Sequence, residues 1–104
     1  MPNMNDILRQ AQIMQRKLSK AQEDLAAKTY EASSGGGMVK VTVSGNYELK
    51  SLVIDPKVMA DGDVEMLQDL IVAAVNEAGR IAKETMEREM GALSGGLKIP
   101  GLFS

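Results

Sequence analysis

The stretch Met38-Val-Lys-Val-Thr-Val-Ser-Gly-Asn-Tyr-Glu-Leu-Lys-Ser-Leu-Val-Ile-Asp55 decides the fold. Its first seven residues alternate three valines with Lys40 and Thr42, which is the period of a half-buried strand. Gly45-Asn46 suits a two-residue hairpin turn with a positive φ at its first position. The chain then returns as a second strand, and Pro56 ends that strand because proline cannot donate to a sheet ladder.

The pairing register of this hairpin has two solutions. With Ser44 opposite Tyr47, the pleat places Leu52 on the face of the three valines. Leu49 and Val53 then lie on the opposite face. Either a bulge resets the register, or something also covers the second face of the sheet.

A weaker strand, residues 30–33, precedes the hairpin and ends at Gly35-Gly36-Gly37. Three glycines also suggest a phosphate-binding loop. Such a loop needs a following Lys-Ser or Lys-Thr pair and opens a helix, whereas these glycines open a strand. The sequence therefore favours a hairpin loop here.

A long helix is expected before the sheet. Asn3 or Asn5 can cap it, and glycine and proline are absent from residue 3 to residue 30. A helix of about 25 residues is about 37 Å long and outlasts a three-stranded sheet, so part of it must project or pair. Its apolar residues alternate steps of three and four and form a heptad seam of Met4, Ile7, Ala11, Met14, Leu18, Ala21 and Leu25.

A second long helix is expected after the sheet and a short helical turn. Asp61 or Asp63 can cap it, and Gly91 can stop it. The first half of this helix is densely apolar, which is typical of a segment buried on a sheet. Its second half, residues 80–90, is amphipathic and highly charged.

The expected architecture is therefore an α+β fold of the order α-β-β-β-α, with a small antiparallel sheet and a short extra helical turn before the last helix. Residues 1–91 form a single domain in this prediction. Residues 92–104 form a flexible tail that contains glycine and proline. A sheet with open edges and two overlong amphipathic helices favours a homodimer.

The composition argues against several classes of protein. The 104 residues include no Cys and no His, which excludes disulfides and thiolate metal sites and removes the commonest general base. No apolar run approaches the roughly 20 residues of a membrane span, and the polar start is no signal peptide. We therefore expect a cytoplasmic protein that is not an enzyme and holds no cofactor.

Two acidic clusters have to be weighed as metal sites. Capping of the last helix explains the first cluster, and a solvated helix face explains the second, so we expect no metal. The clusters are Asp61, Asp63 and Glu65, and Glu84, Glu87 and Glu89.

The charge distribution carries more information than the net charge of −2. Residues 1–28 hold five basic against three acidic side chains, a balance of +2. Residues 56–104 hold five basic against eight acidic side chains, a balance of −3. Because electrostatic binding depends on patches, the first helix is the candidate surface for an acidic partner.

The basic stripe of the first helix consists of Arg9, Arg16 and Lys20, flanked by Lys17. The first three fall at steps of seven and four, on a face away from the apolar seam. Such a stripe is either an ordinary solvated face or a surface that neutralises nucleic-acid phosphates. The sequence has no helix-turn-helix spacing, zinc ligands or aromatic platform, so any DNA binding depends on backbone and shape more than on bases.

Five motifs occur in order and with matching spacing along the chain. They are Gln10-Ala-Gln-Ile-Met-Gln15, Gly36-Gly-Met-Val-Lys-Val-Thr-Val-Ser-Gly45, Leu52-Val-Ile-Asp-Pro56, Met66-Leu-Gln-Asp-Leu-Ile-Val-Ala-Ala-Val-Asn-Glu-Ala78 and Ile99-Pro-Gly-Leu102. Through these motifs, residues 4–103 resemble the YbaB/EbfC family of bacterial nucleoid-associated proteins.

The resemblance implies a tweezers-like homodimer whose long first and last helices project as arms. It also implies binding of double-stranded DNA, DNA compaction at the nucleoid and modulation of gene expression. The alternative is a dimeric scaffold whose apolar seam and methionine-rich arms bind a protein partner in recombination or repair. The resemblance points to seven basic arm residues as DNA contacts: Arg9, Arg16, Lys17, Lys20, Arg80, Lys83 and Arg88.

Overall fold

The computed structural model describes residues 3–93. Its three strands form one antiparallel sheet in the order β1-β2-β3. The predicted α-β-β-β-α order with an extra helical turn is confirmed. The elements are α1 (Met4–Ala27), β1 (Thr29–Ser34), the 3-10 turn η1 (Gly35–Gly37), β2 (Val39–Ser44), β3 (Leu49–Ile54), α2 (Pro56–Ala60) and α3 (Val64–Leu93).

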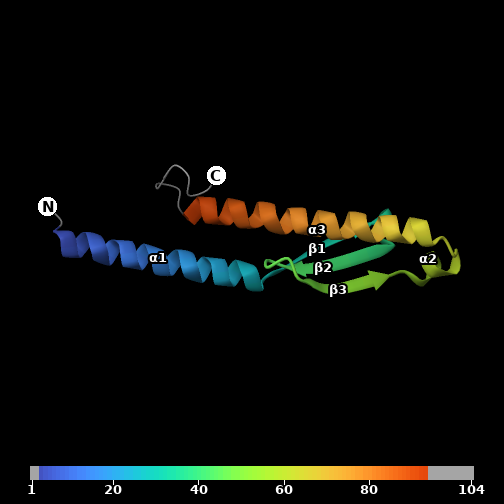
Figure 1. Cartoon of the computed structure of the whole chain (residues 1–104), viewed down its shortest axis with the longest axis horizontal. Coiled ribbons are helices and arrows are strands. Elements are labelled where there is room, and N and C mark those ends of the chain that lie inside the picture. Colours follow the sequence, from blue (N-terminus) through green and yellow to red (C-terminus); the bar gives the residue numbers. More distant parts are fainter. Residues whose placement is uncertain (1–2, 94–104) are drawn as a thin grey trace.

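The molecule is elongated, with extents of 72 × 22 × 16 Å. Figure 1 shows α3 lying along the sheet and continuing past its end, where the helix runs beside α1. The prediction that the long helices outlast the sheet is therefore confirmed. Both long helices extend beyond the strands, and α1 lies almost entirely outside them.

Side-chain caps define where the three helices begin. Asn3 accepts a hydrogen bond from the Asp6 amide at 2.9 Å and so caps α1. Asp63 caps α3 by accepting from the Met66 amide at 3.0 Å. For both long helices, one of the two predicted cap residues is thereby selected. Asp55 caps α2, directly before the proline that ends the sheet.

The predicted stop of the last helix at Gly91 is wrong, because α3 continues to Leu93. A glycine in a helix costs only about 1 kcal/mol relative to alanine, so helix formers on both sides of it can carry the helix through. The predicted tail, from residue 94 onward, lies outside the described residues.

A bulge in β3 settles the register of the hairpin. Thr42 pairs with Ser51 and Val43 pairs with Leu49, so Lys50 is the extra residue. Because of this bulge, Leu49 joins Leu52 on the face of the valines instead of lying on the opposite face. The bulge, one of the two predicted solutions, is confirmed.

The turn between β2 and β3 differs from the prediction. The Ser44 amide donates to the Glu48 carbonyl at 2.9 Å, so the loop is longer than two residues. The positive φ falls on Tyr47, at 64°, and not on Gly45. The Tyr47 amide still donates to the Ser44 carbonyl at 2.9 Å across Gly45-Asn46, and Tyr47 follows as a third loop residue before Ser44 pairs with Glu48.

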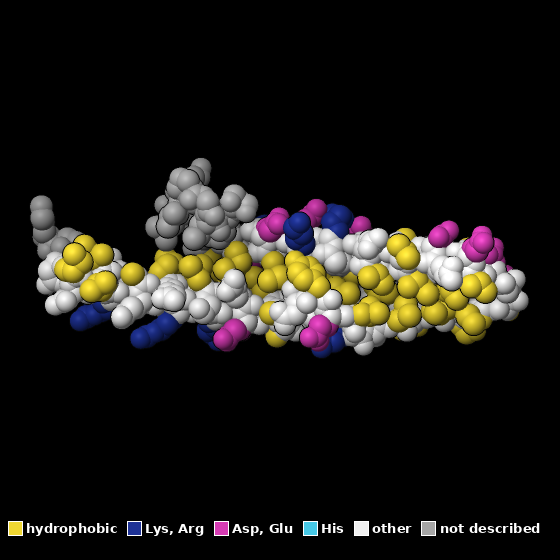
Figure 2. Space-filling view, viewed as in Figure 1, with side chains coloured by type: hydrophobic (Ala, Val, Ile, Leu, Met, Phe, Trp, Pro, Cys, Tyr) yellow, Lys and Arg dark blue, Asp and Glu magenta, His cyan; other side chains and the backbone are white. Residues whose placement is uncertain are grey.

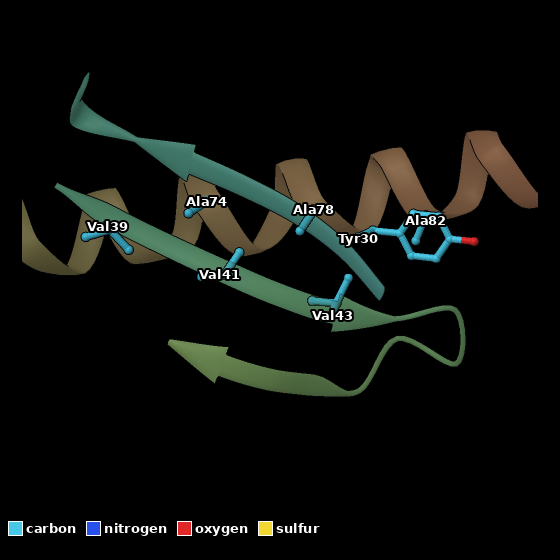
Figure 3. Packing of buried hydrophobic residues seen from close by; sticks show 7 residues of the cluster. All are labelled: Tyr30, Val39, Val41, Val43, Ala74, Ala78 and Ala82. Carbon is cyan, nitrogen blue, oxygen red and sulfur yellow. The ribbon is translucent and has the colours of Figure 1, made fainter. Parts of the chain in front are cut away.

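The core is a thin layer between α3 and the sheet. Ala74, Ala78 and Ala82 lie one turn apart on α3 and are fully buried. They face the three valines of β2, and Tyr30 of β1 closes one end of the cluster (Figure 3). The small alanine side chains let the helix backbone lie close to the strands.

The helix α3 lies mainly over β1 and β2; on the inner face of β3, Ile54 packs partly against the core, and the rest of that face is exposed. Leu49 is 48% exposed and Leu52 is 40% exposed, although both share the face of the buried valines. Figure 2 shows hydrophobic side chains as a band between α3 and the strand beside it. We call the exposed inner face of β3, Leu49 and Leu52, the open apolar face.

Candidate nucleic-acid interface

The basic stripe lies on the side of α1 opposite the apolar seam. At 100° per residue, Arg9, Arg16 and Lys20 fall within about 40° of one another around the helix. Along the axis they are separated by about 10 Å and about 6 Å. The flanking Lys17 is counted with the stripe from here on, and all four residues are exposed. Figure 2 shows basic side chains projecting from the edge of α1 away from the hydrophobic band.

The cations of the stripe are largely free to bind an external anion. Lys20 lies 4.0 Å from the Asp24 carboxylate, and its side chain is 77% exposed. Such a solvated pair contributes little and is easily exchanged. Within residues 3–93, Arg9, Arg16 and Lys17 have no carboxylate within the 4.0 Å of an ion pair.

Uncharged donors surround part of the stripe. An open hollow runs along α1 beside the two basic residues Arg16 and Lys20. Amides and hydroxyls commonly supplement basic side chains at phosphate oxygens, so the composition of this surface suits a polyanion. The hollow is lined by Gln12, Gln15, Arg16, Ser19, Lys20 and Glu23.

The basic residues of α3 have a different environment. Arg80 Nε donates to Glu77 Oε2 at 3.0 Å, and Arg80 Nη1 donates to Glu84 Oε2 at 2.8 Å. A second nitrogen, Nη2, also donates to Glu77. These carboxylates raise the pKa of Arg80, and the guanidinium lowers the pKa of Glu77. The charge of Arg80 is therefore balanced within α3 itself.

Lys83 and Arg88 are exposed, but they do not align with Arg80. At 100° per residue, Lys83 and Arg88 lie about 140° apart around the helix. Glu84 and Glu87 lie between them on the same exposed face. This half of α3 is thus a mixed and mostly acidic surface, without a basic stripe.

Comparison with known proteins identifies the family to which the chain belongs. Residues 1–97 match the profile of the YbaB/EbfC DNA-binding family. This protein belongs to that family. The predicted resemblance is confirmed.

Two bacterial relatives carry the name nucleoid-associated protein. The one from Alkaliphilus metalliredigens is 54% identical over 102 residues, which cover 98% of this chain and 90% of the relative. The one from Thermoanaerobacter pseudethanolicus is 52% identical over 101 residues, which cover 97% and 91%. An uncharacterized protein from Helicobacter pylori has the same fold, with a TM-score of 0.73 and 24% identity over 89% of this chain and 98% of its own.

The structure of this YbaB/EbfC family member separates the seven predicted contact residues into two groups. The four on α1 form one continuous stripe, and the three on α3 are dispersed among acidic side chains. The seven predicted contact residues include no glutamine. The structure puts Gln12 and Gln15 on the hollow next to Arg16, a position that helical spacing alone could have indicated.

Metal binding and membrane insertion are two further possibilities on which the structure of residues 3–93 bears. That part of the chain contains no group of three or more acidic side chains that could hold a metal ion. None of its helices combines the length and the apolar character needed to cross a bilayer.

Proposed function

We propose that this YbaB/EbfC-family protein binds double-stranded DNA as a homodimer with weak sequence preference, organising the bacterial nucleoid and modulating gene expression. The observation that carries the proposal is the exposed basic stripe of α1, directed away from the seam. Membership of a DNA-binding family and the names of the two relatives support it. In this role the protein acts in the cytoplasm, at the nucleoid, and needs neither catalysis nor a cofactor.

The chemistry of the stripe suits phosphates rather than bases. An arginine guanidinium can donate two parallel hydrogen bonds to one phosphate, and a lysine supplies a compact charge. Each neutralised phosphate releases counterions, so affinity should fall steeply with salt. If all eight stripe residues of a dimer contact phosphates, the logarithm of the association constant should fall with a slope of about −7 against the logarithm of salt concentration.

The homodimer is supported by the open apolar face. Leu49 and Leu52 lie on the core side of the sheet without being covered by α3. A second copy related by a twofold axis would cover the same surface on both chains. It would also place two basic stripes on one rigid assembly.

The proposal is tested by fluorescence anisotropy with two labelled duplexes of unrelated sequence. We expect similar affinities for both duplexes at low salt and a parallel, steep loss as salt rises. A large difference between the duplexes would contradict weak sequence preference. Absence of binding to either duplex at low salt would contradict the function itself.

The alternative function, a scaffold for a protein partner in recombination or repair, rests on the tip of α1. Met4, Ile7 and Leu8 are 69%, 50% and 53% exposed there. If this tip is the functional surface, replacing the three residues by serine should abolish capture of the partner in a pull-down. In the same experiment, neutralising the basic stripe should leave that capture unchanged.

A further inference from the structure

The helix α1 is fastened to the rest of the molecule at its C-terminal end. Leu25 is the one residue of α1 that is buried. Met14, Leu18 and Ala21 are half-buried, and the residues nearer the N-terminus are mostly exposed. The basic stripe therefore lies on a projecting helix that is attached to the rest of the molecule at its last turn.

A buried phenol of the sheet contacts the last turn of α1. Tyr30 Oη donates to the Leu25 carbonyl oxygen at 3.3 Å. The last carbonyls of a helix have no partner within the helix, so this bond satisfies one of them. The ring of Tyr30 is 8% exposed and lies beside Ala82 of α3 (Figure 3). Burial, together with the Glu89 carboxylate, raises the pKa of Tyr30, so the hydroxyl keeps its proton at neutral pH.

The turn between β2 and β3 also contacts the last turn of α1. A Cβ atom added at Gly45 would lie 2.2 Å from the Leu25 carbonyl oxygen and 2.7 Å from Ala26 Cα. The Gly45 amide also donates to the Lys28 carbonyl at 3.1 Å. The turn itself is held by two amides that donate to the buried hydroxyl of Ser44, each at 3.2 Å. The backbone of the turn therefore packs closely against the end of α1, and hydrogen bonds fix its conformation.

We propose that Tyr30 and Gly45 form a joint that sets the direction of α1 and thereby positions the basic stripe for DNA, an inference that rests on the proposed function. Arg9 lies sixteen residues from Leu25, which is about 24 Å along the helix. A tilt of about 10° at the joint moves Arg9 by about 4 Å and Lys20 by about 1 Å. A displacement of about 4 Å exceeds the length of a hydrogen bond to a phosphate, whereas a flexible lysine side chain can follow one of about 1 Å.

The direction of α1 can be measured with two spin labels. The chain has no cysteine, so Gln10→Cys on α1 and Ser33→Cys on β1 provide unique exposed sites. Refolding the labelled chain with an excess of unlabelled chain confines the double electron–electron resonance signal to distances within one chain. The comparison includes Tyr30→Phe, Gly45→Ala and the control Gly79→Ala, whose added methyl group has nothing within 4 Å.

We expect the label distance to shift or broaden by several ångströms in both joint variants and to stay unchanged in Gly79→Ala. If circular dichroism shows that Gly45→Ala does not fold, Tyr30→Phe, which removes a single hydroxyl, decides alone. Distance distributions in the folded joint variants that match the parent distribution would overturn the joint.

A second readout connects the joint to DNA. In the parent protein, Arg9→Gln should weaken binding about threefold or more, because each dimer loses two phosphate contacts. In the Tyr30→Phe background, Arg9→Gln should matter less, whereas Lys20→Gln should keep its full effect. Equal losses from Arg9→Gln in both backgrounds would overturn the positioning role. If the parent binds no DNA at low salt, the proposed function fails, and the label distances still decide whether the joint exists.

Discussion

The same substitution, glycine to alanine, should have opposite effects at two positions of this chain. Gly36 has a φ of +67° and open surroundings, so alanine there must adopt the left-handed conformation. We expect Gly36→Ala to lower the free energy of unfolding by about 1 kcal/mol. Gly79 lies within α3 in open space, and Gly79→Ala should raise it by about 1 kcal/mol. Urea unfolding of both variants measures the two changes, and a loss at Gly79 would contradict its open surroundings.

The buried phenol gives the protein a pH dependence at the alkaline end. The pKa of Tyr30 is raised above its ordinary value of 10.0, mainly by burial. Because the folded state favours the protonated phenol, its contribution to stability is complete below pH 10 and is lost as pH rises through the raised pKa. We expect the urea midpoint to fall more steeply above pH 10 in the parent than in Tyr30→Phe.

Exposed Tyr47 provides the control for this pH dependence. Other groups also titrate above pH 10, so the contribution of Tyr30 is taken from the difference in urea midpoint between the parent and Tyr30→Phe. Tyr47→Phe, which removes an exposed hydroxyl, is measured beside Tyr30→Phe under the same conditions. A Tyr30→Phe curve parallel to that of the parent would contradict a raised pKa for the buried phenol.

At the scale of the elements, the close packing of α3 on β2 depends on side-chain size and on the absence of charge. Ala78 is fully buried against the sheet, so Ala78→Leu should force the layers apart and cost about 1 to 3 kcal/mol. Val41 is 1% exposed, and Val41→Asp would bury an unpaired carboxylate. We expect circular dichroism to show that Ala78→Leu still folds and that Val41→Asp does not.

A matched control for these core variants lies on the exposed side of the same helix. Val72 is 57% exposed and shares α3 with Ala78. Val72→Asp should leave the helical signal intact, because its carboxylate stays in water. A folded Val41→Asp protein would contradict the position of the core.

Much of the fold was predictable because its signals are local. The alternation of residues 38–44, the proline after Asp55 and the helix caps depend on near neighbours in the chain. The choice of a bulge was not predictable, because it depends on which face of β3 the rest of the molecule leaves open. The continuation of α3 past Gly91 depends likewise on its context, since a glycine can end a helix or lie within it.

The candidate site was predictable to a similar extent. Helical spacing alone places Arg9, Arg16 and Lys20 on one face of α1, as the structure does. Arg80 differs, because its predicted role depends on whether its side chain reaches Glu77 and Glu84, which spacing permits but does not require. The contact between Leu25 and Gly45 could not be predicted from the sequence, because residues twenty apart in the chain meet only after folding.

At the scale of the whole molecule, the oligomeric state depends on the open apolar face. Leu52 and Val53 are neighbours on β3 that point to opposite sides of the sheet, and both are exposed, by 40% and 58%. Sedimentation equilibrium should give twice the chain mass of 11.2 kDa for the parent. We expect Leu52→Lys to give the monomer mass, since a lysine on the open apolar face opposes burial by a second copy. Val53→Lys should remain a dimer, and a monomeric Val53→Lys would place the interface on the other face.

In the proposed function, the basic stripe of α1, and not the overall charge of the protein, binds DNA. Two variants of equal net charge test it, each with four cations replaced by glutamine. The stripe variant changes Arg9, Arg16, Lys17 and Lys20, and the control variant changes the exposed residues Lys28, Lys40, Lys50 and Lys57.

The measurement is the slope of the logarithm of the DNA association constant against the logarithm of salt concentration, for the parent and both variants. We expect the stripe variant to lose most of a parent slope of about −7, and the control variant to keep a slope close to that of the parent. Equal slopes for the two variants would contradict this expectation, because binding would then follow net charge and not the stripe on α1.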